Sequence, residues 1–281
     1  MAHRRCHRKD ATAASALEVK ARNDVSVFSL EERARLRDAL VSLAETDERI
    51  TGAALTGSAA VGREDQWSDI DLALCLASDV DPSLVILDWT DRMYQEHGAV
   101  HHVDVLWGAV VFRVFLLANT LQVDVAFWPP AEFGATAPTF QLLFGTANER
   151  PMPSAPTAAE LIGMAWLYAL HARSSIERGR VWQAEYMVSG VRDRVLALAC
   201  LRHDVPAGEG RGMDSLPPEL TTGMTGALVG SLDTVELRRA FRVASQALLI
   251  EISQVDTDLA RRVAGPLVEL AELPPSLAQQ Q

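Results

Sequence analysis

The chain has 281 residues, of which 48% are apolar and 22% are charged, and its formal net charge at pH 7 is −11. This length and apolar content predict a globular protein that is large enough for two modest domains. The acidic balance argues against a non-specific nucleic-acid binder, which would normally carry a basic patch, and it suits a small cationic substrate. Cys6, Cys75 and Cys200 are scattered without metal-ligand spacing, which indicates reduced thiols.

The basic N-terminal residues 1–25 do not read as a targeting signal. No apolar core follows them, as a secretory signal requires, and no apolar run of the sequence reaches the length of a membrane span. We therefore expect a disordered basic tail over 1–25 and a cytoplasmic protein. Neither a membrane nor a nucleic acid is expected among its partners.

The first predicted elements alternate between helix and strand. From Ser29 onward, a capping-box pattern precedes leucines at helical spacing, which predicts a helix. The apolar segment 49–57 ends in glycine and predicts a strand, and a second strand is predicted over 69–77. A helix over 82–97 is opened by proline and stopped by glycine.

Three extended segments follow, over 100–108, 110–118 and 121–129. Only Asn119 and Thr120 separate the last two segments, so we expect a hairpin of antiparallel strands there.

The character of the sequence changes after residue 135. Residues 136–156 are rich in proline, alanine and glycine and predict a linker, whereas long helical patterns fill residues 157–275. We therefore predict an α+β fold, with a small sheet domain and flanking helices over 26–135, followed by a C-terminal helical bundle.

Asp69 and Asp71 lie one residue apart at the start of the second predicted strand. Alternate residues of a strand project from one face, so both carboxylates project together while Ile70 and Leu72 point into the core. Two carboxylates this close repel each other unless a divalent cation lies between them. Oxygen ligands suit Mg²⁺, which typically also binds substrate phosphates. The pair therefore predicts a magnesium site for a nucleoside triphosphate.

Gly57 and Ser58 end the preceding strand, ten residues before the aspartate pair. Glycine lets the backbone approach a phosphate closely, and the serine hydroxyl and amide can donate to phosphate oxygens. The residues that follow read as a helical turn, whose N-terminal amides favour an anion. Gly57 and Ser58 are therefore predicted to bind the nucleotide.

Residues 56–74, TGSAAVGREDQWSDIDLAL, resemble the signature of the DNA polymerase beta-like nucleotidyltransferase superfamily: an apolar strand, Gly-Ser, a helical turn, then Asp-x-Asp on the next strand. The layout beyond residue 28 is most similar to that of bacterial aminoglycoside and lincosamide nucleotidyltransferases. The resemblance identifies the domain over 26–135 as catalytic. It implies Mg²⁺-dependent transfer of a nucleoside monophosphate from an NTP, with ATP as the expected donor and pyrophosphate as the leaving group.

The resemblance also implies a third carboxylate on a neighbouring strand, and two VDV triplets offer Asp104 and Asp124. We favour Asp124, because enzymes of this type carry the acid on the second strand of a hairpin before the linker. We expect that strand to be an antiparallel addition to the sheet of the aspartate pair. Asp124 would then be a metal ligand, the general base, or both. Asp104 is either a solvated strand residue or a contact to the acceptor.

The helix after Gly179 places Glu185, Tyr186 and Arg192 on one broad face. Glu185 is a candidate to bind a cationic acceptor, Tyr186 to stack on the base or the acceptor, and Arg192 to hold phosphate. The alternative is a surface network of contacts within the helix.

These observations predict a nucleotidyltransferase (EC 2.7.7 type) that acts on a hydroxyl of a small acceptor, such as an aminoglycoside or lincosamide antibiotic, and so confers resistance. We expect a monomer or a homodimer. The rival hypothesis is an antitoxin-like or regulatory protein with the same fold, which binds or modifies a protein partner. The presence of Asp69, Asp71 and Asp124 favours the enzyme.

Overall fold

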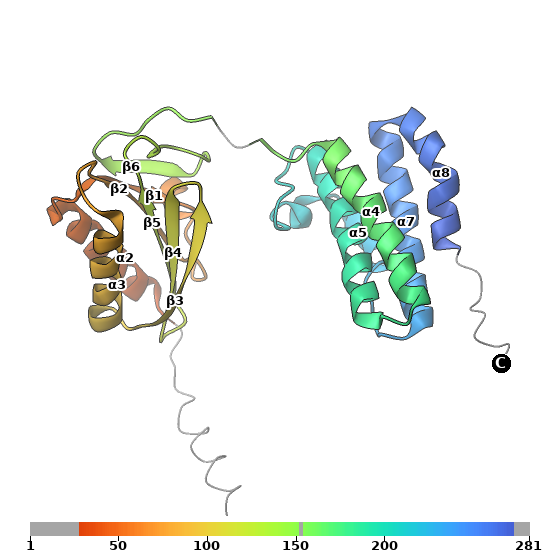
Figure 1. The fold of residues 1–281 in the computed structure, drawn as a ribbon, viewed down its shortest axis with the longest axis horizontal. Coiled ribbons are helices and arrows are strands. Elements are labelled where there is room, and N and C mark those ends of the chain that lie inside the picture. The colour runs from red at the N-terminus through yellow and green to blue at the C-terminus, as the bar shows by residue number, and fades with distance from the viewer. Residues whose placement is uncertain (1–27, 152–153, 273–281) are drawn as a thin grey trace, which may run out of the picture. The chain divides into compact units, whose positions relative to one another are not determined.

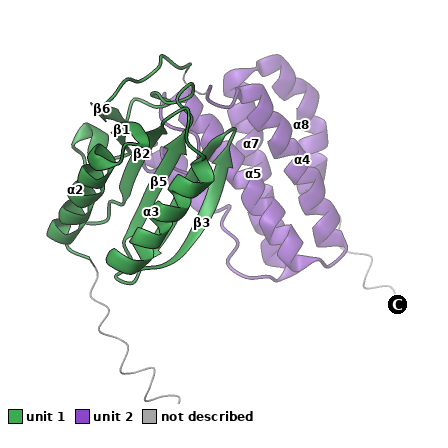
Figure 2. Cartoon of the chain, turned by 60° about the vertical axis from the view of Figure 1, so that its left-hand side comes forward, with its two compact units in different colours: residues 1–153 green, residues 154–281 purple. Residues whose placement is uncertain are grey.

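The computed structural model describes residues 28–151 and 154–272, so the tail predicted over 1–25 lies outside the described residues. The chain divides into two compact units, residues 1–153 and residues 154–281 (Figure 2). Among the described residues, no helix combines the length and the apolar character that a bilayer crossing needs.

The first unit is a six-stranded sheet with flanking helices (Figure 1). Its first described helix begins where the sequence predicts it. Ser29 Oγ accepts from the Glu32 N–H, and the Glu32 carboxylate accepts from the Ser29 N–H, which completes the capping box. The elements in chain order are α2 (Leu30–Thr46), β1 (Ile50–Thr56), the short 3-10 helix η1 (Ala59–Val61), β2 (Ile70–Leu76), α3 (Pro82–Glu96), β3 (Ala99–Trp107), β4 (Val110–Leu117), β5 (Gln122–Trp128) and β6 (Phe140–Phe144).

The strand order across the sheet is β3-β4-β5-β2-β1-β6. The hairpin predicted at Asn119 and Thr120 joins β4 and β5, which are antiparallel. The expectation that β5 runs antiparallel to the strand of the aspartate pair is wrong, since β5 pairs with β2 in parallel. The reason is topological. Each of the two hairpins, β3 to β4 and β4 to β5, reverses the chain direction, so β5 runs in the same direction as β3. That direction is also the direction of β2.

The predicted linker over 136–156 contains a strand. Within it, β6 pairs with β1 in antiparallel orientation and forms the edge of the sheet. Gly145 follows β6 with a φ of +82°, and a Cβ there would collide with the backbone of Thr51. Proline and alanine on both sides of a five-residue apolar run concealed this strand, and the boundary between the units falls at residue 153.

The two faces of the sheet are covered unequally. On one face, Leu40 of α2 and Trp89 of α3 belong to the main core of the unit, together with alternate strand residues such as Ile70. On the other face, a smaller cluster around Trp128 and Phe133 covers the C-terminal ends of β2 and β5. The N-terminal ends of these two strands are left partly exposed on this second face.

The second unit is helical, as predicted. Its first helix begins after Thr157, whose side chain and that of Glu160 form the expected capping box. Alanines and leucines of the long helices share one core with Phe241 at its centre. The elements are α4 (Ala158–Glu177), α5 (Val181–Arg202), η2 (Met213–Ser215), α6 (Pro218–Thr225), α7 (Thr234–Val255) and α8 (Thr257–Ala271). The chain is therefore an α+β sheet unit followed by C-terminal helices.

Candidate functional site

Asp69, Asp71 and Asp124 form a carboxylate cluster at the N-terminal ends of β2 and β5. Asp71 lies directly opposite Asp124 in the parallel ladder, and Asp69 precedes the first residue of β2. One oxygen of each carboxylate lies within 4.8 Å of the corresponding oxygens of the other two. The structure therefore brings together the three aspartates that the sequence analysis groups.

The geometry of the carboxylate cluster fits a magnesium ion. Ligand oxygens on opposite sides of Mg²⁺ are about 4.2 Å apart, because each lies 2.0–2.1 Å from the ion. Ligand oxygens on adjacent positions of the ion are about 3 Å apart. The three side chains, which are partly exposed and have oxygens up to 4.8 Å apart, would therefore rotate toward one another to bind the ion. Three carboxylates would leave coordination positions for phosphate oxygens and water.

Gly57 leaves the space that the Asp71 carboxylate fills. Its φ of +63° lies in the left-handed region, and a Cβ built on it would collide with a carboxylate oxygen of Asp71. Glycine is required here both by the backbone conformation and by the close approach. The next residue, Ser58, begins a tight turn in which its carbonyl accepts from the N–H groups of Val61 (3.3 Å) and Arg63 (3.0 Å). The predicted phosphate-binding turn therefore lies directly beside the carboxylate cluster.

Gln122 links two carboxylates of the cluster, a role that the sequence analysis did not assign. Its Nε2 donates to Asp124 Oδ1 (3.0 Å) and to Asp69 Oδ2 (3.4 Å). The pKa of Asp124 is raised to about 6, chiefly because the carboxyl is buried; the hydrogen bond from Gln122 opposes this rise and the charge of Asp69 adds to it. Asp124 is therefore protonated at a higher pH than an ordinary aspartate.

Arg33 of α2 is buried and holds the loop that leads into β2, a role that the sequence analysis also missed. Its Nη1 donates to the backbone carbonyls of Asp65 and Ser68, the latter at 3.1 Å. Its Nε lies 3.5 Å from Glu64 Oε1, and Arg37 contacts the other oxygen of Glu64 at 2.7 Å. Because Ser68 directly precedes the first aspartate of the cluster, these contacts fix the backbone from which that aspartate projects.

Asp104 is not part of the carboxylate cluster. In the ladder it lies opposite Arg113, which in turn lies opposite Val125, a residue of the main core. Asp104 therefore projects from the helix-covered face, whereas Asp124 projects from the other face. Arg113 donates to both oxygens of Asp104 at 2.7 Å and lowers its pKa. This placement disfavours the expectation that Asp104 contacts an acceptor bound at the carboxylate cluster.

The three residues predicted in the helical half lie on α5 of the second unit. Glu185 accepts from Ser189 Oγ (2.8 Å), and Arg192 pairs with its neighbour Asp193 (2.8 Å). Both contacts lie within the helix, as in the alternative interpretation of these residues as a surface network. Tyr186 is exposed, and its ring lies 6.4 Å from that of Tyr168. Their roles toward a nucleotide or an acceptor stay predictions.

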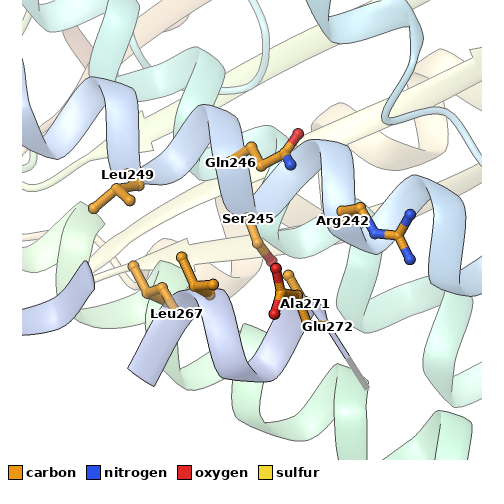
Figure 3. A pocket seen from close by; sticks show the side chains of 8 residues that line it. Arg242, Ser245, Gln246, Leu249, Leu267, Ala271 and Glu272 are labelled. Atoms are coloured by element: carbon orange, nitrogen blue, oxygen red, sulfur yellow. The ribbon is translucent and has the colours of Figure 1, made fainter. Parts of the chain in front are cut away.

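A separate cavity lies between α7 and α8 of the helical unit (Figure 3). Figure 3 shows Arg242, Ser245 and Gln246 on one wall and Leu267 and Glu272 on the other. The Ser245 hydroxyl is buried and has no hydrogen-bond partner among the described residues. With one buried hydroxyl and one carboxylate, this cavity offers no counterpart to the carboxylate cluster.

Comparison with known proteins yields a likeness to solved structures but none to a family model or a curated protein. Among solved structures, the chain is similar to an aminoglycoside 6-adenyltransferase from Bacillus subtilis, with 14% sequence identity over 83% of this chain and 96% of that chain and a TM-score of 0.36. A likeness this weak carries no argument about the activity, which has to be inferred from the chain's own residues.

Asp124→Asn should stabilise the metal-free protein at neutral pH. The pKa of Asp124 is about 6 in the folded protein against an ordinary value of 3.8. Its charge therefore opposes folding above about pH 6, and this opposition disappears as the pH falls toward 4. We expect the substitution to raise the melting temperature in EDTA at pH 7.5 by about 2–4 °C, as about 1 kcal/mol would. The gain should vanish near pH 4 in circular dichroism melts.

Asp104→Asn is the matched control for this experiment and should have the opposite sign. Arg113 lowers the pKa of Asp104, so this carboxylate stabilises the fold above its ordinary pKa, and the stabilisation is lost as the pH falls through the lowered value. We expect Asp104→Asn to lower the melting temperature at pH 7.5. Shifts of the same sign for the two variants would contradict the placement of these aspartates.

If the carboxylate cluster binds Mg²⁺ with ATP, as the sequence predicts, Arg33→Lys should weaken that binding while the chain stays folded. Lysine keeps the charge, but it is a single compact ammonium group without the planar fork through which Arg33 Nη1 reaches the two carbonyls while Nε faces Glu64. Outer partners of metal ligands typically contribute about 10- to 100-fold to affinity. We therefore expect at least about a tenfold higher dissociation constant by titration calorimetry. Arg35→Lys, at an exposed position of the same helix, is the control and should change nothing.

Proposed function

We propose that this protein is a Mg²⁺-dependent nucleotidyltransferase, which moves a nucleoside monophosphate from an NTP to a hydroxyl of a small acceptor and releases pyrophosphate. The observation that carries the proposal is the convergence of Asp69, Asp71 and Asp124 beside the Gly57 turn. The resemblance of residues 56–74 to the nucleotidyltransferase signature supports it, with ATP as the expected donor.

The carboxylate cluster would hold the metal. A bound Mg²⁺ supplies charge neutralisation at the transferred phosphoryl group and the departing pyrophosphate. Asp69 and Asp71 project from one strand end toward it, and the Gly57–Ser58 turn offers backbone N–H groups to the terminal phosphates. Gln122 and the Arg33 contacts keep these groups in place before the substrate arrives.

Asp124 would act at the acceptor side of the reaction. The acceptor oxygen forms a bond to the α-phosphorus, and the bond between that phosphorus and the oxygen bridging to the β-phosphate breaks, so that pyrophosphate leaves. The hydroxyl proton passes to the Asp124 carboxylate, which lies directly opposite Asp71 on the side of β5. Asp124 also completes the metal site if the ion binds all three carboxylates.

The proposal includes the acceptor only by class. A hydroxylated antibiotic of the aminoglycoside or lincosamide type is the expected acceptor, and Tyr186 of the helical unit, exposed on α5, is its candidate stacking residue. A monomer or a homodimer in the cytoplasm would suffice for this chemistry.

Asp69→Asn and Asp71→Asn should each abolish nucleotidyl transfer and leave the fold intact, because each removes a charge that the metal needs and the core does not. Asp124→Asn should reduce turnover by about 10²–10⁴-fold, as the loss of a general base does. The assay is mass spectrometry of added nucleotide after incubation with Mg²⁺, each NTP and a panel of hydroxylated antibiotics. Near-normal turnover by Asp69→Asn or by Asp71→Asn would exclude the mechanism.

ATP with Mg²⁺ should raise the melting temperature of the wild-type protein, and EDTA should remove most of the rise. A ligand that binds only the native state at 100 times its dissociation constant stabilises it by about 2.7 kcal/mol. Asp69→Asn should lose the shift, whereas Asp104→Asn should keep it. An equal shift with and without the metal would indicate a nucleotide site unrelated to the carboxylate cluster.

A further inference from the structure

A row of side chains crosses the sheet from the carboxylate cluster to its β3 edge. Val114 of β4 lies directly opposite Asp124, and Val103 of β3 lies directly opposite Val114. Residues opposite one another in an antiparallel ladder project from the same face. Val103 and Val114 therefore share the face of the carboxylate cluster, and Val103 lies about 10 Å from Asp124, two strand spacings away.

The surface around this row is apolar and exposed. On β3, Val103 and Val105 are 55% and 54% exposed, and Leu116 of β4 is 48% exposed. By register, Val105 lies opposite Phe112 and Leu116 lies opposite Gln122, so all of them share the face of Asp124. We call Val103, Val105, Phe112, Val114 and Leu116 the apolar row.

The two strands that carry the apolar row present no carboxylate on this face. The only residues of β3 and β4 with a full charge are Asp104 and Arg113, and these pair with each other on the helix-covered face. His101, opposite Leu116, is the titratable group of these strands that shares the face of the row. The carboxylates nearest the row are those of the cluster, which a metal ion would occupy, and Glu132, whose Oε2 lies 3.8 Å from Arg150 Nη1. The row itself therefore offers an ammonium group no carboxylate.

The direction of the reaction places the acceptor over the apolar row. In a displacement at phosphorus, the attacking oxygen and the leaving oxygen lie roughly in line on opposite sides. Gly57, which begins the turn proposed for the departing pyrophosphate, directly follows β1, and β1 lies on the far side of β2 from β5. The attacking hydroxyl therefore approaches from the Asp124 side, and the rest of the acceptor extends over β4 and β3.

We propose that the apolar row binds the acceptor, and that the acceptor is a hydroxyl compound with an apolar body rather than a polycation. This inference rests on the proposed function, because the direction of attack sets the place of the acceptor. Burial of an apolar group against the row supplies the binding free energy, at roughly 25 cal/mol per Å². Of the acceptor classes that the sequence predicts, the proposal therefore disfavours the aminoglycosides, which are polycations.

The test uses three probes that carry sugar hydroxyls: methyl glucoside, hexyl glucoside and kanamycin, a polycation. Each is titrated into the full chain with Mg²⁺ and a non-hydrolysable ATP analogue, and binding is followed by saturation-transfer NMR and calorimetry. We expect hexyl glucoside to bind at least about tenfold more tightly than methyl glucoside, with saturation on its alkyl protons. Kanamycin should bind no more tightly than methyl glucoside.

Substitutions on two faces of one strand locate the binding surface. The double variant Val103→Ser/Val105→Ser should lose the preference for the hexyl chain. Leu106→Ser is the matched control and should keep it, because Leu106 is exposed on the same strand but lies opposite Val111 on the helix-covered face. All three positions are exposed, so the variants should fold normally.

The proposal is overturned if the hexyl chain gives no gain in affinity, if kanamycin binds most tightly, or if Leu106→Ser acts like the double variant. A failure of the proposed function gives a different result. In that case the ATP analogue with Mg²⁺ does not bind the wild-type chain, or binds equally well to Asp69→Asn, in the same samples before any probe is added.

Discussion

The repulsion among three carboxylates is the constraint on which the architecture of this site depends. Asp69, Asp71 and Asp124 come within 4.8 Å of one another, and a sheet gains nothing from such a cluster. Gln122 donates to two of the three, and the absence of a Cβ at Gly57 gives the third its space. Three carboxylate oxygens held this close together are ligands that suit a divalent cation.

Rigidity at this site comes from one helix. The loop between β1 and β2 packs against the core at its start, through Ala59 and Ala60. Its end is held by Arg33, whose guanidinium donates to the carbonyls of residues 65 and 68. Glu64 and Arg37 extend the same network to the surface. A buried arginine with carbonyl and carboxylate partners fixes a backbone more firmly than exposed ion pairs do.

The sequence predicted the parts of the site that follow from local periodicity. Alternation along β2 placed Asp69 and Asp71 on one face, and glycine at the strand end marked the turn. The direction of β5 and the face of Asp104 were not predictable in this way, because both depend on how many hairpins separate β5 from β2. Arg33 was hidden for another reason, since its partners are backbone carbonyls of the loop at residues 65 and 68, which have no sequence signature.

The order of the strands turns this cluster into a site with two different sides. Along one line across the sheet, the turn at Gly57 comes first, then Asp71 and Asp124, and then Val114 and Val103. Polar backbone groups that suit a polyanion stand on one side of the carboxylates, and apolar side chains stand on the other. The proposed reaction, in which a charged leaving group departs on the side opposite an organic nucleophile, would use this arrangement. This difference between the two sides arises because β5 lies between β2 and β4 and pairs with β2 in parallel. The hairpin pattern of the sequence did not reveal that pairing.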